Sequence, residues 1–245
     1  MALRTQNGSP VSGGRLALEL GVSRVAVWKG IQSLVKAGYP VDTVEAGYSL
    51  DPGKPADFLY PWEFGESESM FRHFENTGST MDRMRECAVQ GNAGGTVVIA
   101  ERQDAGKGRC GRNWVSGQGG LYFTVLERPV RQALTDYRLT LMLYQIAVAR
   151  VLGAVCGKPA RLRWPNDIYI GGRKIVGLIT ELAGEGDEIR WLATGIGINV
   201  NNTPPLDGSV SCAEILGHQV SRRELLLGIM DEARRIKKRV GCIRA

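Results

Sequence analysis

Histidine is scarce in this sequence: only His73 and His218 occur among 245 residues, far apart in the chain. A histidine-based triad or a multi-histidine metal site needs such residues to converge, so we interpret both as incidental. The five cysteines are odd in number and no pair is spaced as CxxC. That pattern argues against a disulfide framework and against a zinc ribbon.

Long apolar runs are also lacking, since we find no stretch that would span a bilayer and no apolar signal-peptide core at the N-terminus. We therefore expect a cytoplasmic protein without a membrane partner. Hydrophobic residues make up 43% and charged residues 23%, which is typical of a globular protein. The net charge of +6 suits a polyanionic partner such as nucleic acid or a triphosphate, but surplus surface lysine and arginine would give the same value.

Two prolines and a glycine in DPGKPAD, residues 51–57, indicate a domain boundary. We predict a small N-terminal module over residues 1–54 and a larger domain over residues 55–245. The fold class that we predict for the whole chain is α+β, because strands follow one another and helices are grouped instead of alternating with them.

The small module has the pattern of a winged helix-turn-helix. A short helix over Arg15–Leu20 precedes a glycine turn, Ser23 is a natural N-cap, and a second helix runs over Arg24–Ala37. Its apolar residues recur at helical spacing, and a hairpin over 41–50 would form the wing. The spacing gives the following apolar stripe: Val27, Ile31, Leu34 and Val35.

The opposite face of the second helix carries side chains suited to DNA. Arginine and glutamine can read base edges, and lysine can hold a phosphate. A solvated face of a purely structural domain is the alternative. The candidate DNA-binding residues are Arg24, Trp28, Lys29 and Gln32.

In the larger domain, patterns predict helices over 80–90 and 136–155 and strands over 96–101, 121–126, 168–170, 174–182 and 190–195. Two capping boxes, starting at Ser211 and Ser221, predict two more helices. Residues 106–111, GKGRCG, match the dinucleotide fingerprint GxGxxG, but no helical pattern follows, so Rossmann binding fails its context test. We interpret the segment instead as a basic loop that closes over an anionic or reactive ligand.

A second polar cluster follows in RWPND, residues 163–167, and in RKIVG, residues 173–177. Asp167 could hold a Mg²⁺ ion that a nucleotide brings, and Lys174 could meet a phosphate or a developing negative charge. An Asn-Asp turn beside a surface lysine is the simpler alternative.

The ordered combination of Ser79-Thr80, the loop from Gln103 through GKGRCGRNW, RWPND, RKIVG and GIGIN at 195–199 closely resembles the biotin–protein ligase family. With the winged helix in front, the chain resembles the bifunctional biotin operon repressor/biotin ligase type. The resemblance implies a mixed-sheet α+β catalytic domain of the biotin ligase/class II synthetase-like type. Because the chain stops at Ala245 just after its last helix, we expect the SH3-like C-terminal domain usual in this type to be absent. Met1–Gly8 would be only a stub of the usual first helix.

The family joins biotin and ATP into biotinoyl-5′-adenylate, releases pyrophosphate, and transfers biotin to a lysine of a carrier domain, as in acetyl-CoA carboxylase. The resemblance therefore implies biotin, ATP and Mg²⁺ as ligands. The partners that it implies are a biotin carrier protein, operator DNA and a second copy of the chain in a homodimer.

By the same resemblance, Lys174, Arg109, Arg112 and Asp167 would be catalytic. The residues implied for biotin are Ser79, Thr80, Met81, Gln103, Lys107, Gly108, Arg109 and Lys174; relatives often carry Asn in place of Met81. The residues implied for the nucleotide are Arg109, Arg112, Trp114, Asn166 and Asn199. Two alternatives stay open: a DNA-binding biotin sensor without useful ligase activity, and a lipoate-type ligase.

Overall fold

The computed structural model describes residues 3, 8–51, 57–128, 137–186, 188–204 and 206–241. The chain divides into two compact units, Met1–Asp57 and Phe58–Ala245. The boundary expected after residue 54 falls within residues 52–56, which lie outside the described residues, as does most of the expected helix stub at 1–8.

Within its described residues, the first unit has two helices followed by a hairpin, as the sequence pattern predicts. Ser23 caps the second helix, because its Oγ accepts a hydrogen bond from the Ala26 amide at 3.1 Å. Gly21 ends the first helix in the left-handed conformation that glycine adopts readily. The elements are α1 (Gly13–Leu20), α2 (Arg24–Lys36), β1 (Val41–Val44) and β2 (Gly47–Leu50).

The core of the first unit is small. Val27 and Ile31 of α2 are buried, but Val35 is 45% exposed, so the expectation that it faces the core is wrong. Val35 lies eight residues beyond Val27, which rotates it about 80° around the helix and away from this narrow core.

The hairpin is fixed to the module by paired backbone hydrogen bonds between Val11 and Tyr48, both 2.9 Å long. Gly47 permits this approach, since a Cβ there would lie 2.1 Å from the Val11 carbonyl oxygen.

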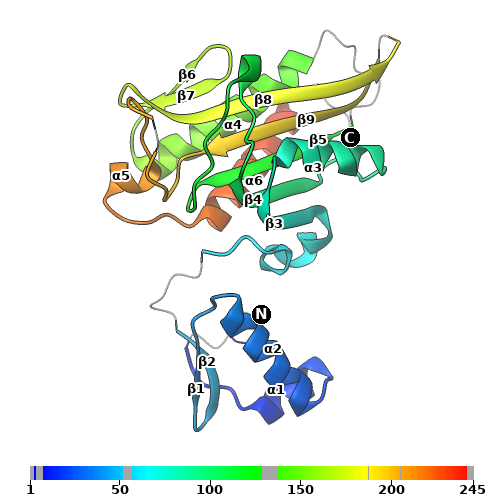
Figure 1. The fold of residues 1–245 in the computed structure, drawn as a ribbon, viewed down its shortest axis with the longest axis vertical. Helices are drawn as coiled ribbons and strands as arrows, with labels where there is room; N and C mark the ends of the chain where they lie inside the picture. The colour runs from blue at the N-terminus through cyan, green and yellow to red at the C-terminus, as the bar shows by residue number, and fades with distance from the viewer. Residues whose placement is uncertain are drawn as a thin grey trace. The chain divides into compact units, whose positions relative to one another are not determined.

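The second unit contains a seven-stranded mixed sheet in the order β3-β4-β5-β9-β8-β7-β6 (Figure 1). Only β3 and β4 pair in parallel, and every other neighbouring pair is antiparallel. The strands are β3 (Phe71–Thr77), β4 (Val97–Gln103), β5 (Leu121–Glu127), β6 (Ala160–Arg163), β7 (Asp167–Ile170), β8 (Arg173–Glu185) and β9 (Glu188–Ile198). The helices are η2 (Pro61–Met70), α3 (Thr80–Val89), η3 (Arg109–Gly111), α4 (Tyr137–Cys156), α5 (Cys212–Leu216) and α6 (Arg222–Val240).

Successive side chains of each strand point to opposite faces of the sheet, and helices pack on both faces. Val97 and Ile99 of β4 point into the large core that α4 and α6 also line. Val98, between them, points to the other face and packs with Met81 and Met84 of α3. The helix α3 therefore covers one face, and the pair α4 and α6 covers the other, as Figure 1 shows.

Two strands were missed in the sequence, and both are edge strands of the sheet: β3 and β6. The β3 segment FRHFENT and the β6 segment ARLR are rich in polar and charged residues. Each edge strand has only one hydrogen-bonded neighbour, so their sequences lack the continuous apolar run that marks β4 and β5.

The expectation that no segment has the length and composition of a membrane span is also wrong. Helix α4 has both, with a mean hydropathy of 1.8 over an 18-residue stretch. It nevertheless behaves as a core helix. Its buried residues include Leu143, Ala147 and Leu152, which belong to the main core together with residues of α6. A helix buried between a sheet and another helix is apolar on more than one side.

Candidate active site

The face of the sheet that carries α3 has a floor of glycine between β8 and β9. Val176 and Leu178 of β8 point into the core on the far face, so Gly177 points toward α3. The same alternation in β9 directs Gly195 and Gly197 to this face, and Gly177 pairs directly with Gly197. The missing side chains leave space above the middle of the sheet.

The Trp114 indole lies on this floor. A Cβ at Gly177 would approach the Trp114 ring to 2.6 Å, and a Cβ at Gly197 would approach Nε1 to 2.4 Å. Trp114 Nε1 is shielded from solvent and has no hydrogen-bond partner in the described part of the chain. Met81 of α3 lies over the neighbouring glycine, because a Cβ at Gly195 would meet the Met81 sulfur at 2.7 Å.

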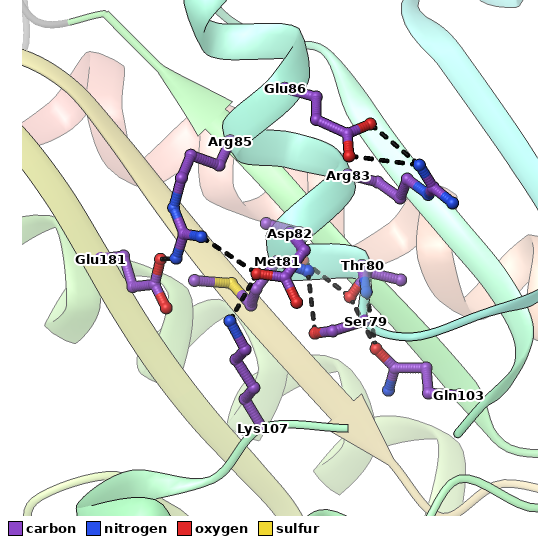
Figure 2. Close-up of polar contacts among 11 residues, drawn as sticks. Ser79, Thr80, Met81, Asp82, Arg83, Arg85, Glu86, Gln103, Lys107 and Glu181 are labelled. Atoms are coloured by element: carbon purple, nitrogen blue, oxygen red, sulfur yellow. Dashed lines mark hydrogen bonds and ion pairs between the residues drawn. The ribbon is translucent and has the colours of Figure 1, made fainter. Parts of the chain in front are cut away.

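A polar group forms the end of the cavity beneath the start of α3. Gln103 Oε1 accepts hydrogen bonds from the Thr80 amide at 2.8 Å and from Thr80 Oγ1 at 3.1 Å. Gln103 Nε2 donates to Ser116 Oγ at 2.7 Å. Ser79 caps α3 and accepts from the Met81 amide at 3.2 Å, as the sequence predicts (Figure 2).

The glycine-rich segment forms a loop that folds back on itself beside the cavity. A backbone bridge joins Lys107 to Asn113, and the Gly108 amide donates to the Arg112 carbonyl at 2.7 Å. Between them lies only the short turn η3, so the segment lacks the helix that a dinucleotide site requires. Arg109 donates to Asn166 Oδ1 at 3.3 Å and so links the loop to the RWPND segment.

Lys174 and Asp167 form an ion pair at the other end of the cavity, with Nζ and Oδ1 2.8 Å apart. The ammonium also lies 5.3 Å from the centre of the Trp114 ring, within cation–π range. Asp167 Oδ1 still lacks a hydrogen bond of good geometry from the described residues. The short distance makes the two groups an ion pair, and the poor alignment leaves a lone pair of this oxygen available to a ligand.

These groups line one cavity of about 560 Å³. Every residue that the sequence assigns to biotin, to the nucleotide or to catalysis lies in its wall. That set is Ser79, Thr80, Met81, Gln103, Lys107, Gly108, Arg109, Arg112, Trp114, Asn166, Asp167, Lys174 and Asn199. Asn199 is buried, and its Oδ1 accepts from Asn202 at 3.0 Å. Residues from six separate segments thus converge on one space.

In the first unit, the four candidate DNA-binding side chains are all exposed on α2. Trp28 is 54% exposed. The Arg24 guanidinium lies over α1, since a Cβ at Gly14 would come within 2.9 Å of it. These residues are therefore accessible along one helix.

The family model described as the biotin/lipoate A/B protein ligase family matches residues 74–200, and a helix-turn-helix model matches residues 1–49. The bifunctional ligase/repressor BirA of Bacillus spizizenii is 36% identical over 243 residues, which covers 93% of this chain and 74% of that protein. The chain belongs to the biotin/lipoate A/B protein ligase family.

Solved structures of the same family share the fold. The biotin protein ligase from Aquifex aeolicus in complex with biotin and ATP is 30% identical, with a TM-score of 0.56 over 67% of this chain and 68% of that one. The Leishmania major biotin protein ligase in complex with biotinyl-5-AMP is 26% identical, with a TM-score of 0.57 over 66% of this chain and 72% of that one. The expected α+β class and the winged helix-turn-helix are confirmed for this family member.

Sequence reasoning missed part of the wall of this ligase-family cavity. Tyr169 is one example, and its hydroxyl accepts from Arg163 at 3.1 Å while the Arg163 guanidinium lies over its ring. Leu206 and Ser209 come from residues 206–210, a segment that we call the strap. It pairs with Lys174 through backbone hydrogen bonds. The alternation of Tyr169 with buried Ile168 and Ile170 could have revealed that it points toward the opposite face. No sequence signal marks the strap.

Proposed function

We propose that this chain is an ATP-dependent biotin–protein ligase. It activates the biotin carboxylate as biotinoyl-5′-adenylate with release of pyrophosphate, and it passes biotin to a lysine of a carrier domain. The observation that carries the proposal is the convergence of cationic side chains on a cavity that also holds a neutral polar end. Such an enzyme must hold a neutral head group at one end and neutralise a carboxylate and a phosphate at the other.

The polar end suits the ureido head of biotin. A buried ureido group needs matched partners, because each unsatisfied polar group costs about 1–3 kcal/mol. Ser79, Thr80 and Gln103 supply donors and acceptors there, and Met81 lies on the apolar floor beside them. A bound ureido group would form hydrogen bonds with Thr80 and Gln103 in place of the bonds that these two residues make with each other.

The cationic end suits the reacting groups. A carboxylate oxygen attacks the α-phosphorus of ATP, the bond from that phosphorus to the bridging oxygen breaks, and pyrophosphate leaves. Both reactants are anionic, so Lys174, Arg109 and Arg112 offset their repulsion. Trp114 and Asn199 border the nucleotide, and Lys107 and Gly108 belong to the loop that covers the activated carbonyl. The acceptor lysine then attacks that carbonyl and releases AMP.

The protein offers few ligands for a metal ion of its own. Within the described ranges, no group of three His, Cys, Asp or Glu residues is placed to hold a metal. Mg²⁺ commonly uses one or two carboxylates together with phosphate and water, and Asp167 has an oxygen with spare hydrogen-bonding capacity. The residues thus fit a Mg²⁺ ion that arrives with ATP and that would neutralise phosphate charge, with Asp167 as its protein ligand.

Pyrophosphate release with biotin and ATP tests the proposal on the full chain. Release that depends on both substrates supports a ligase. If biotin binds by calorimetry but no pyrophosphate forms, the chain is a biotin sensor without useful turnover. Competition between biotin and lipoate distinguishes the lipoate-type alternative, since tighter binding of lipoate would exclude a biotin ligase.

The exposed α2 face supports a second role as a biotin-responsive repressor, because a winged helix-turn-helix presents such a face to the major groove. We propose that Arg24, Trp28, Lys29 and Gln32 contact operator DNA. We further propose a cytoplasmic location and a homodimer on DNA, since paired half-sites are read by paired copies. Sedimentation with and without operator DNA tests the dimer.

A further inference from the structure

A chain of charged side chains joins the glycine-rich loop to the body of the second unit (Figure 2). Lys107 Nζ on the loop lies 2.5 Å from Asp82 Oδ1 in the first turn of α3. The same carboxylate oxygen accepts from Arg85 at 3.1 Å, and Arg85 also donates to Glu181 of β8 at 2.6 Å. We name these four residues, Lys107, Asp82, Arg85 and Glu181, the loop latch.

The charges of the latch alternate, so each group stabilises the next. Asp82 lies between two cations, and Glu181 lies beyond the second. The hydrogen bond and the charge of Glu181 raise the pKa of Arg85. Asp82 also lies near the N-terminus of α3, where a carboxylate is favoured by the helix dipole. Loss of Asp82 would leave the two cations facing each other without an intervening anion.

The latch is strong enough to bias the loop but weak enough to open. Its side chains are partly exposed, from 27% at Glu181 to 47% at Arg85, so water and salt screen the attraction. Lys107 stands at the base of the self-bonded loop, where its backbone bridges to Asn113. A contact at the base restrains all the residues between these two positions.

We propose that Asp82 is a positioning residue which holds the glycine-rich loop closed over the cavity by pairing with Lys107. The proposal rests on the proposed ligase function for its purpose, which is to retain the adenylate until an acceptor lysine arrives. It assigns no chemical step to Asp82. Closure is reversible because the pair must break for the activated intermediate to leave.

Limited proteolysis of the ligand-free chain tests the latch without reference to any activity. An arginine-specific protease can cut the loop after Arg109 and after Arg112, and mass spectrometry identifies those two cuts. For Asp82→Asn we expect loop cleavage about 2- to 5-fold faster than in the parent, which is the range for loss of a partly exposed ion pair. Glu86→Gln is the matched control, since it removes the same charge from the same helix but pairs with Arg83 instead of the loop.

Salt and a charge exchange make the test specific. Raising the salt concentration should speed loop cleavage in the parent and in Glu86→Gln, but much less in Asp82→Asn. Lys107→Gln should speed cleavage after Arg109 and Arg112 as Asp82→Asn does, and the double variant with both changes should be cut little faster than either single variant, because both changes remove one contact. Equal cleavage rates in Asp82→Asn and Glu86→Gln would overturn the proposal. Fully additive effects of the two changes, in a double variant that melts at the same temperature as the single variants, would overturn it too.

Adenylate retention is the second readout. We expect Asp82→Asn to form adenylate at close to the parent rate but to release it about 2- to 5-fold faster, in step with loop opening. If the loop of Asp82→Asn is cleaved faster but the variant releases adenylate at the parent rate, the retention role is overturned. If the parent forms no adenylate at all, the ligase function fails, and proteolysis alone decides whether the latch holds the loop.

Discussion

At the residue scale, the proposed reaction depends on a few charged side chains whose partners would differ between the free and the reacting states. Lys174 now pairs with Asp167 across 2.8 Å. In the reaction that we propose, its second partner is the negative charge that grows on the phosphate. An interaction that strengthens only as the reaction proceeds lowers the barrier without strengthening ground-state binding.

We therefore predict that Lys174→Ala lowers the rate of adenylation by about 100-fold, the scale of losing one electrostatic contact to a transition state. Biotin affinity should change far less. Pyrophosphate release gives the rate, and calorimetry gives the affinity. Lys158→Ala, an exposed lysine outside the cavity, serves as the charge-matched control. Equal losses of rate and of affinity would argue against the role of Lys174.

Arg109 is a residue-scale case of a different kind, because it connects the loop to Asn166 as well as lining the cavity. Arg109→Gly removes that link and adds backbone freedom to the loop. We predict a protein that still makes the adenylate but loses it to solvent. Chromatography of the reaction mixture should detect free biotinoyl-adenylate, and its absence would count against closure by this loop.

At the element scale, β8 and β9 determine where the cavity lies. Gly177 and Gly197 face α3, while Val176, Leu178 and Ile196 face the core that α4 and α6 line. The strands predicted over 174–182 and 190–195 include only part of this alternation, since GIGIN at 195–199 extends past the second of them. What the sequence could not give was the register that pairs Gly177 with Gly197, or the Trp114 ring that lies on both. Those facts depend on contacts between segments distant in the chain.

We predict that Gly197→Ala displaces the Trp114 indole, because the added Cβ would lie 2.4 Å from its Nε1. The affinity for ATP in the presence of biotin should fall at least tenfold, as measured by calorimetry, if the ring borders the nucleotide as proposed, since tenfold corresponds to about 1.4 kcal/mol. Gly117→Ala is the control, because a Cβ there meets no atom within 4 Å. Unchanged ATP affinity would exclude Trp114 from the nucleotide site.

The helix caps are elements that sequence patterns predict well. Serine caps at positions 23, 79, 211 and 221 each accept the expected backbone hydrogen bond, because capping is local chemistry. The edge strand β3 and the strap at 206–210 escaped prediction, since their conformations depend on neighbours that the local sequence does not specify. Motif order predicts residues that line one cavity, but it gives no sign of the charged contact between Lys107 and Asp82.

At the scale of the whole molecule, the protein combines two units with separable chemistry. The first unit has its own core, and its α2 face is exposed. The second unit contains the whole cavity described above. A change on α2 should therefore alter DNA binding and leave the ligase cavity intact.

We predict that Lys29→Ala weakens binding to DNA from upstream of biotin genes and leaves pyrophosphate release unchanged. If Lys29 neutralises one phosphate, the slope of log affinity against log salt should become shallower by about one. Gel shifts over a range of salt concentrations measure both effects. Glu19→Gln, a charge change on α1, is the control, and a variant that loses DNA binding and ligase activity together would contradict the separation.

The glycine floor, which the Trp114 indole partly covers, also limits how this protein can be stabilised. An added Cβ at Gly177, Gly195 or Gly197 would come within 2.7 Å of the Trp114 ring or the Met81 sulfur, so even alanine there overpacks the site and costs stability. The same change would disturb the wall of the cavity that we propose for biotin and ATP. Variants selected only for thermal tolerance should therefore accumulate changes on the α4 and α6 side, and side chains added to the floor should lower both heat resistance and activity.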